Sequence, residues 1–162
     1  SLSLISKSLY LAVEEPDNVA ARGAMLVASC LGGISCIKGL GIVHAIAHMV
    51  GAEYDTHHGL TNAIILPAVL RFNLPGMDEK VKRMSEAMQF EGDSAESFIS
   101  NIEKLLDRIN IPKGLGEIGV PEDCAERIAK KSMVDTAFGT NPRNASYDEM
   151  FELVKTSINQ AR

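Results

Sequence analysis

Residues 41–60 read GIVHAIAHMVGAEYDTHHGL and contain all four histidines of this 162-residue chain. His44 and His48 are four residues apart, so a helix would project both from one face, with roughly 5–6 Å between their Cβ atoms. His58 follows after Gly51 and a polar turn, where the chain can double back and present a third imidazole to that face. We therefore expect these three rings to share one pocket.

This spacing is compatible with an open metal site, because imidazole is the commonest nitrogen ligand for zinc and iron. A zinc protease is excluded, since Ala45 stands where that class of enzyme has its general-base glutamate. A structural zinc site is also excluded, since no cysteine lies at finger spacing from the histidines. The expected site is thus a catalytic type of ion site that is short of ligands.

A structural role for the same residues stays open at this point. One or two of the histidines could be core groups bonded to backbone carbonyls, with the others at the surface. His57 would point away from the other rings, either into solvent or toward the outside of the site. Glu53 and Asp55 could orient an imidazole, or could simply be solvated turn residues.

The rest of the chain predicts an all-α protein, a multi-helix bundle of about seven or eight helices in one domain over residues 1–162. Apolar residues recur at spacings of three and four, and alternating strand patterns are missing. We expect N-terminal caps at Asp17 or Asn18, at Asp93 or Ser94, and at Ser146. The expected helices cover residues 2–14, 19–33, 39–54, 60–73, 78–90, 94–109 and 146–159, with one more starting near Pro121 and with Pro67 at a kink or junction.

Composition limits the function classes. The net charge of −5 comes from interspersed charges, so we expect neither nucleic acid nor a membrane surface as a partner. No apolar run of about 18 residues and no signal peptide are evident, which predicts a cytoplasmic protein. Cys30, Cys36 and Cys124 are expected to be reduced, buried thiols.

Two long segments resemble one known family. Residues 41–73 resemble the metal-binding signature of the iron-containing (group III) alcohol dehydrogenases, and residues 115–154 are similar to the closing segment of that family, notably TNPR at 140–143. The residues that carry the first match are Gly41, His44, His48, Gly51, His58, Gly59, Ala63, Leu66, Pro67 and Asn73. The resemblance covers almost the whole chain.

The resemblance implies the helical C-terminal domain of such an enzyme, with a dehydroquinate synthase-like fold. It implies His44 and His58 as ligands of Fe²⁺ or Zn²⁺, and His48 as a catalytic residue near the nicotinamide. Asp135, with Asn141 and Arg143 of the TNPR turn, would approach the cleft from the other side. Asn-Pro is also an ordinary turn signal, so a capping role for Asn141 and a structural salt bridge for Arg143 stay open as alternatives.

The family's upstream D-x3-H ligand pair and its NAD- or NADP-binding domain have no match here, and the chain starts at Ser1 within a helical pattern. We therefore expect a fragment that lacks the N-terminal nucleotide-binding domain and is inactive alone. Its expected partners are that domain, a small alcohol or aldehyde substrate, and further copies of itself in a homo-oligomer. The alternative is a non-catalytic helical association module with weak or no metal binding.

Overall fold

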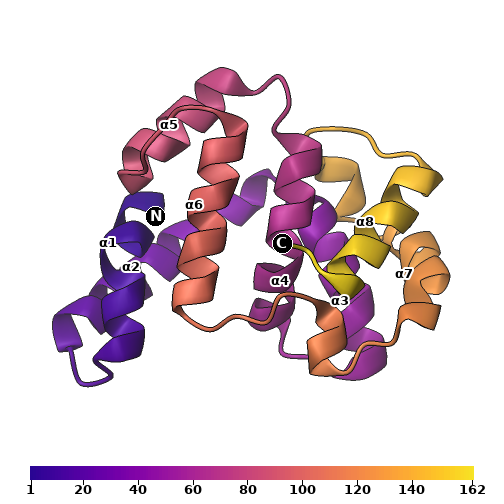
Figure 1. Cartoon of the computed structure of the whole chain (residues 1–162), viewed down its shortest axis with the longest axis horizontal. Coiled ribbons are helices and arrows are strands. Elements are labelled where there is room, and N and C mark those ends of the chain that lie inside the picture. The colour runs from indigo at the N-terminus through magenta and orange to yellow at the C-terminus, as the bar shows by residue number, and fades with distance from the viewer. The chain divides into compact units, whose positions relative to one another are not determined.

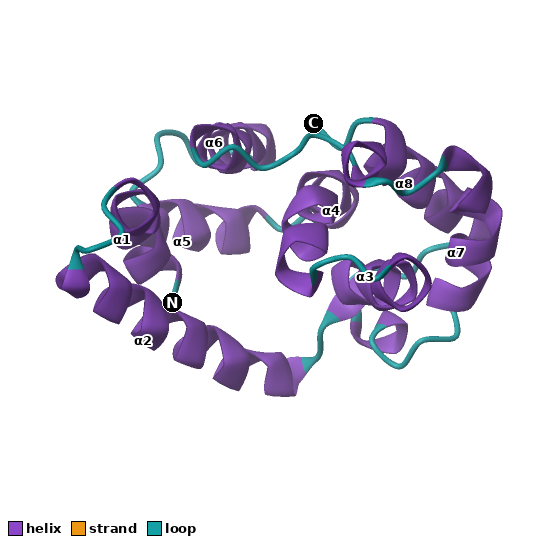
Figure 2. Ribbon diagram, turned by 90° about the horizontal axis from the view of Figure 1, so that it is seen from below, coloured by secondary structure: helices purple, strands orange, loops and turns teal.

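The computed structural model describes residues 1–162 and confirms the all-α prediction: helices and connecting loops make up the whole chain (Figures 1 and 2). Short 3-10 helices lie between the main ones. The eight α-helices are α1 (Leu2–Glu14), α2 (Val19–Ser35), α3 (Gly41–Tyr54), α4 (His58–Asn73), α5 (Asp78–Met88), α6 (Ala95–Arg108), α7 (Ala125–Ser132) and α8 (Tyr147–Asn159).

Side-chain caps explain several of the helix starts. The Asn18 side chain accepts a hydrogen bond from the backbone of Ala21, and Ser94 caps α6 in the same way. Ser146 and Glu149 form a reciprocal capping box at the start of α8. The predicted cap at Ser146 is confirmed, and Asn18 and Ser94 are the residues used at the other two sites.

Some expected helix ends differ from the observed ones. Gly32 lies inside α2, which runs on to Ser35, because the real break is at Gly39 with its φ of +111°. A Cβ at Gly39 would lie only 2.3 Å from Thr140 Cβ, so close backbone approach as well as conformation requires glycine there. Pro67 is buried within α4 rather than at a junction.

The chain folds into two compact units, each built from two separate stretches of sequence. Unit 1 comprises residues 1–37 and 74–110, and unit 2 comprises residues 38–73 and 111–162. All four histidines belong to unit 2. The prediction of a single domain over residues 1–162 stays a prediction.

Unit 1 contains α1, α2, α5 and α6, with α1 packed on both α2 and α5. Its buried apolar side chains include Val81, Phe98 and Ile102, and the Arg108 guanidinium lies 3.3 Å from the centre of the Tyr10 ring. This cation–π contact ties the end of α6 to α1.

One side of α2 is apolar and exposed. Val19 and Leu26 of α2 are 81% and 74% exposed, and Ile37 in the 3-10 turn after α2 is 86% exposed. The segment Val19–Lys38 is long and apolar enough to cross a membrane by length and composition alone, so the expectation that no run reaches that length was wrong. The expectation of buried cysteines was also wrong for Cys30 and Cys36, because both lie on exposed faces of this segment, whereas Cys124 is buried.

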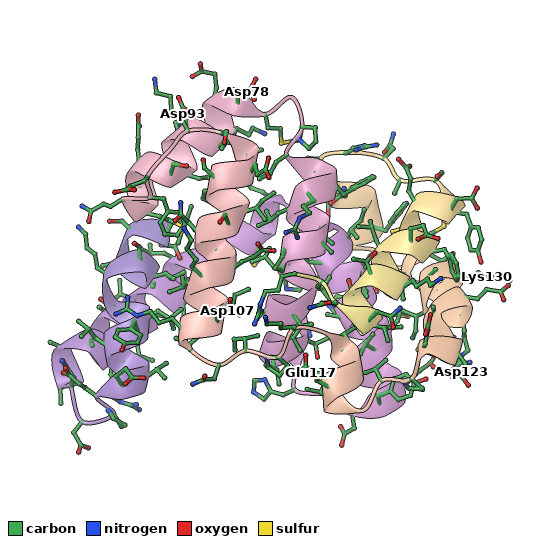
Figure 3. The ribbon with its side chains drawn as sticks, in the orientation of Figure 1. Asp78, Asp93, Asp107, Glu117, Asp123 and Lys130 are labelled. Atoms are coloured by element: carbon green, nitrogen blue, oxygen red, sulfur yellow. The ribbon has the colours of Figure 1, made fainter.

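Unit 2 has a continuous hydrophobic core made by α3, α4, α7 and α8. Ile42, Ile46, Ile64, Ile128 and Met150 are fully buried in it. The charged residues of α7 face outward, as Figure 3 shows for Lys130, with Asp123 just before the helix. This core holds α3 and α4 against each other, and His44, His48 and His58 lie on these two helices.

Candidate functional site

Helix α3 presents His44 and His48 from a face that is only partly buried. Ala45, Ile46 and Ala47 have no exposed surface, whereas both histidines are half-buried. The four-residue spacing therefore does what the sequence predicted and sets the two imidazoles one above the other. His58 reaches the same place from the first residue of α4.

The three imidazole rings gather into one cluster, which we call the histidine cluster (His44, His48 and His58). The ring centroids of His44 and His48 are 5.8 Å apart, those of His44 and His58 are 5.3 Å apart, and those of His48 and His58 are 5.6 Å apart. The rings of His48 and His58 are nearly parallel, with an interplanar angle of 14°. The three histidines predicted to share a pocket are thus brought together.

Asn62 joins two of the rings. Its amide Nδ2 lies 3.3 Å from His44 Nε2 and 3.0 Å from His58 Nε2. Both imidazole nitrogens therefore face the same point. Asn62 is one helical turn after His58 on α4, which places the two side chains on one face of that helix.

Asp135 holds the third ring. Its Oδ2 lies 3.1 Å from His48 Nδ1, and its Oδ1 accepts a hydrogen bond of 2.8 Å from the backbone N–H of Ala137. The carboxylate is mostly buried, with 12% of its side chain exposed, whereas 34% of the His48 side chain is exposed. A carboxylate at Nδ1 favours a proton on that nitrogen and leaves the His48 Nε2 lone pair free.

The environment of His44 keeps its imidazole neutral. Burial lowers the pKa of His44 below its ordinary value, and repulsion from His58 and His48 lowers it further. The backbone of Leu40 and the charge of Asp135 oppose this effect only in part. A neutral imidazole with an available lone pair is the form that binds a metal ion.

The other acidic and basic residues of residues 41–60 have structural roles. His57 is exposed, and its Nδ1 accepts a hydrogen bond from the backbone N–H of Leu60, so it caps α4. Glu53 does not touch an imidazole: its carboxylate pairs with Arg127 and Lys131 of α7, at 2.9 Å and 2.6 Å. Asp55 ends α3 in the left-handed conformation.

The TNPR turn supports the start of α3. Asn141 Oδ1 accepts hydrogen bonds from the backbone N–H of Ile42, at 3.2 Å, and from Asn73 Nδ2, at 3.0 Å. Arg143 pairs with Glu149 at 2.8 Å and stacks over the Phe72 ring, 4.0 Å from its centre. These contacts are those of a capping residue and a structural ion pair, the alternatives to a role in the cleft.

A cavity of about 580 Å³ lies elsewhere in unit 2, along α4 and α8. Arg71, Arg143, Glu149 and Glu152 are among the residues that line it, and no histidine does. The histidine cluster is therefore not part of this cavity.

Comparison with known proteins shows which family the chain belongs to. Residues 1–158 match the C-terminal part of the Fe-containing alcohol dehydrogenase family. The chain belongs to this family. It is 36% identical over 165 residues to 1,3-propanediol dehydrogenase of Citrobacter freundii and 32% identical over 165 residues to NAD-dependent methanol dehydrogenase of Bacillus methanolicus, covering 98% of this chain and 43% of each relative.

The fold is that of the C-terminal domain of iron-containing alcohol dehydrogenases. A crystal structure of 1,3-propanediol oxidoreductase superposes with a TM-score of 0.92 at 35% identity, covering 97% of this chain and 43% of the other. The chain thus spans less than half the length of the relatives that it matches.

The family implies a metal ion, and the residues present fit part of a site for one. The Nε2 atoms of His44 and His58 both approach Asn62 Nδ2, so two lone pairs converge as two ligands of one ion would. Within residues 1–162, however, no three His, Cys, Asp or Glu side chains are arranged to hold an ion together.

Sequence reasoning missed Asn62 as a member of the site. The signal that could have found it is its position four residues after His58, since that spacing puts both on one face of α4. The sequence also placed Asp135 near the cleft without predicting its contact with His48. The sequence alone gives no reason to pair residues 48 and 135.

Proposed function

We propose that residues 1–162 are the metal-binding domain of an NAD(P)-dependent, iron-containing alcohol dehydrogenase that interconverts an alcohol and an aldehyde or ketone by hydride transfer. The observation that carries this proposal is the convergence of the His44 and His58 Nε2 atoms beside the ring of His48. Membership in the family and its similarity to named alcohol dehydrogenases support it.

In this proposal His44 and His58 hold Fe²⁺ or Zn²⁺. Neutral imidazoles leave most of the positive charge on the ion. When bound, the ion supplies Lewis acidity toward the oxygen of the alcohol or the carbonyl group. His48 handles the proton of the alcohol, since its Nδ1 faces Asp135 and its Nε2 is the nitrogen left to accept a proton and pass it to solvent.

The remaining parts of the enzyme belong to the same proposal. NAD or NADP binds mainly to an N-terminal nucleotide-binding domain, a D-x3-H pair on an upstream helix supplies the missing metal ligands, and the protein works in the cytoplasm as a homo-oligomer. Residues 1–162 alone are then inactive. The share of the relatives' length that this chain leaves unmatched is long enough for such a domain.

A second function is favoured by one observation, the exposed apolar side of α2. A helical association module would use such a surface, and its histidines would bind metal weakly or not at all.

Zn²⁺ titration followed by calorimetry separates the two functions. The proposed dehydrogenase domain binds Zn²⁺, and His44→Ala and His58→Ala each weaken the binding at least tenfold, because either change removes one of two ligands. The matched control is His57→Asn, which keeps a capping acceptor for α4 and should leave the affinity unchanged. Equal binding by all four proteins would exclude the histidine cluster as the metal site.

Activity gives an independent check. The isolated chain should oxidise no alcohol with NAD or NADP. Turnover that disappears in His44→Ala would contradict the assignment of cofactor binding to another domain.

A further inference from the structure

The Asn62 amide faces the two Nε2 lone pairs, of His44 and His58, through which these rings would bind a metal ion. Its Nδ2 is 3.3 Å from one Nε2 and 3.0 Å from the other, and an amide nitrogen carries two hydrogens. One N–H can therefore be donated to each ring. The two N–H donors of the amide thus match the two Nε2 acceptors. An asparagine that merely lay near two histidines at the surface would not need this match.

These two hydrogen bonds fix the state of both rings. Each Nε2 must be an acceptor to receive an amide hydrogen, so each ring carries its own proton on Nδ1. The tautomer selected in this way is the one whose Nε2 could bind a metal. The Asn62 hydrogen bonds thereby favour the tautomer that can bind a metal, and they also occupy the two Nε2 lone pairs.

Packing restricts the alternatives for the Asn62 amide. Its Oδ1 is buried and has no hydrogen-bond partner. Turning the amide around would leave two buried N–H donors without acceptors where Oδ1 is now, whereas the observed orientation leaves one such donor, the Nδ1–H of His44, which is also buried without a partner. The bonds to the histidines therefore favour the observed orientation.

We propose that Asn62 is a positioning residue that selects the Nδ1–H tautomers of His44 and His58 and competes with the metal ion for their Nε2 lone pairs. The tautomer selection depends only on the hydrogen bonds, and the competition with the metal ion rests on the proposed metal-binding function. Metal entry then requires the amide to move away, which lowers affinity and keeps the ion exchangeable.

The test uses Asn62→Ala in the full chain, with Zn²⁺ as the probe. Asn62→Ala loses both the two competing hydrogen bonds and the tautomer selection, and we expect the first effect to dominate and to tighten Zn²⁺ binding about tenfold, measured by competition with a chromogenic chelator. The matched control is Asn73→Ala, which removes an amide from the same helix that is bonded to Asn141 rather than to a histidine. Its affinity should equal that of the wild type. Weaker or unchanged binding by Asn62→Ala would overturn the competition.

A metal-free measurement tests the positioning separately. In two-bond ¹H–¹⁵N spectra at pH 8, the wild type and Asn73→Ala should show His44 and His58 as Nδ1–H tautomers, and Asn62→Ala should shift both toward the Nε2–H form. Unchanged tautomers in Asn62→Ala overturn the inference, whether or not Zn²⁺ binds. If no protein binds Zn²⁺, the proposed metal site fails, while a tautomer shift still supports Asn62 as the residue that positions the two rings.

Discussion

His48 Nδ1 lies 3.1 Å from Asp135 Oδ2, although 87 positions separate the two residues in the sequence. The carboxylate is itself fixed by the backbone N–H of Ala137, at 2.8 Å from its other oxygen. Because a fixed acceptor holds the ring by Nδ1, the other nitrogen of His48 keeps one orientation beside His44 and His58. The contact with Asp135 therefore orients the ring of His48, the residue proposed to handle the proton.

Removal of the carboxylate should therefore release the ring. In Asp135→Ala, His48 should shift from the Nδ1–H tautomer to a mixture rich in Nε2–H, which ¹⁵N chemical shifts report directly. Asp123→Ala is the control, since Asp123 is exposed and lies away from the core of unit 2 (Figure 3). If the His48 tautomer is the same in both variants, the pair does not orient the ring.

The helices of this protein follow from local sequence, whereas the site follows only in part. Spacing on a helix placed His44 and His48 together, and the turn before His58 allowed the third ring to return. Contacts between distant segments, such as Asp135 with His48 and Asn141 with Ile42, depend on how α3 packs against the rest of unit 2. Periodicity carries no information on those pairings.

Exposure was the other property that sequence predicted poorly. Periodicity shows that one face of a helix is apolar, but not whether another element covers that face. Cys30 and Cys36 were expected inside for this reason, and they lie on the uncovered side of α2 and the 3-10 turn after it.

Glu53 should contribute to stability through α7. Its two ion pairs lower the pKa of its carboxyl group, first through Lys131, while burial opposes the shift. Since the folded pKa is lowered, this stabilisation is fully present above the ordinary pKa of 4.5 and is lost as the pH falls through the lowered value. Glu53→Gln should lower the free energy of unfolding by roughly 1 kcal/mol at pH 7.

Urea unfolding at pH 7 and at low pH checks this prediction. The difference between Glu53→Gln and the wild type should shrink as the pH falls below 4.5. Glu152→Gln, at an exposed position of α8, is the control. A difference that is independent of pH would mean that charge is not the cause.

Asn141 should matter for folding rather than for chemistry. Its side chain caps the first turn of α3 and pairs with Asn73 through a second hydrogen bond of 2.8 Å. Asn141→Ala should cost roughly 1–2 kcal/mol, measured by thermal unfolding, because a cap and a half-buried amide partner are lost together. Asn144→Ala, an exposed neighbour in the same loop, should cost much less. Equal costs would contradict the capping role.

Metal binding by this chain should be weak and sensitive to pH. Two imidazoles supply fewer ligands than a closed site, so EDTA in slight excess should remove Zn²⁺ within minutes. Affinity should fall as the pH drops through the pKa of His44, which burial holds below its ordinary value, because a protonated imidazole cannot bind. Zinc that stays bound through extended dialysis against EDTA would indicate further ligands that the two histidines do not account for.

The exposed apolar side of α2 should drive self-association of the chain. Leu26 is 74% exposed and Val27 is 53% exposed, and side chains of this size gain free energy when water is removed from them. Sedimentation velocity should show dimers or larger species at micromolar concentration, and Leu26→Glu should shift the distribution toward monomer because a buried carboxylate is costly. Ser29→Glu adds the same charge at an exposed polar position of α2 and should have a smaller effect. A monomeric wild type would show that this surface does not bind a second copy, and an equal effect of both variants would attribute the change to net charge rather than to the apolar contact.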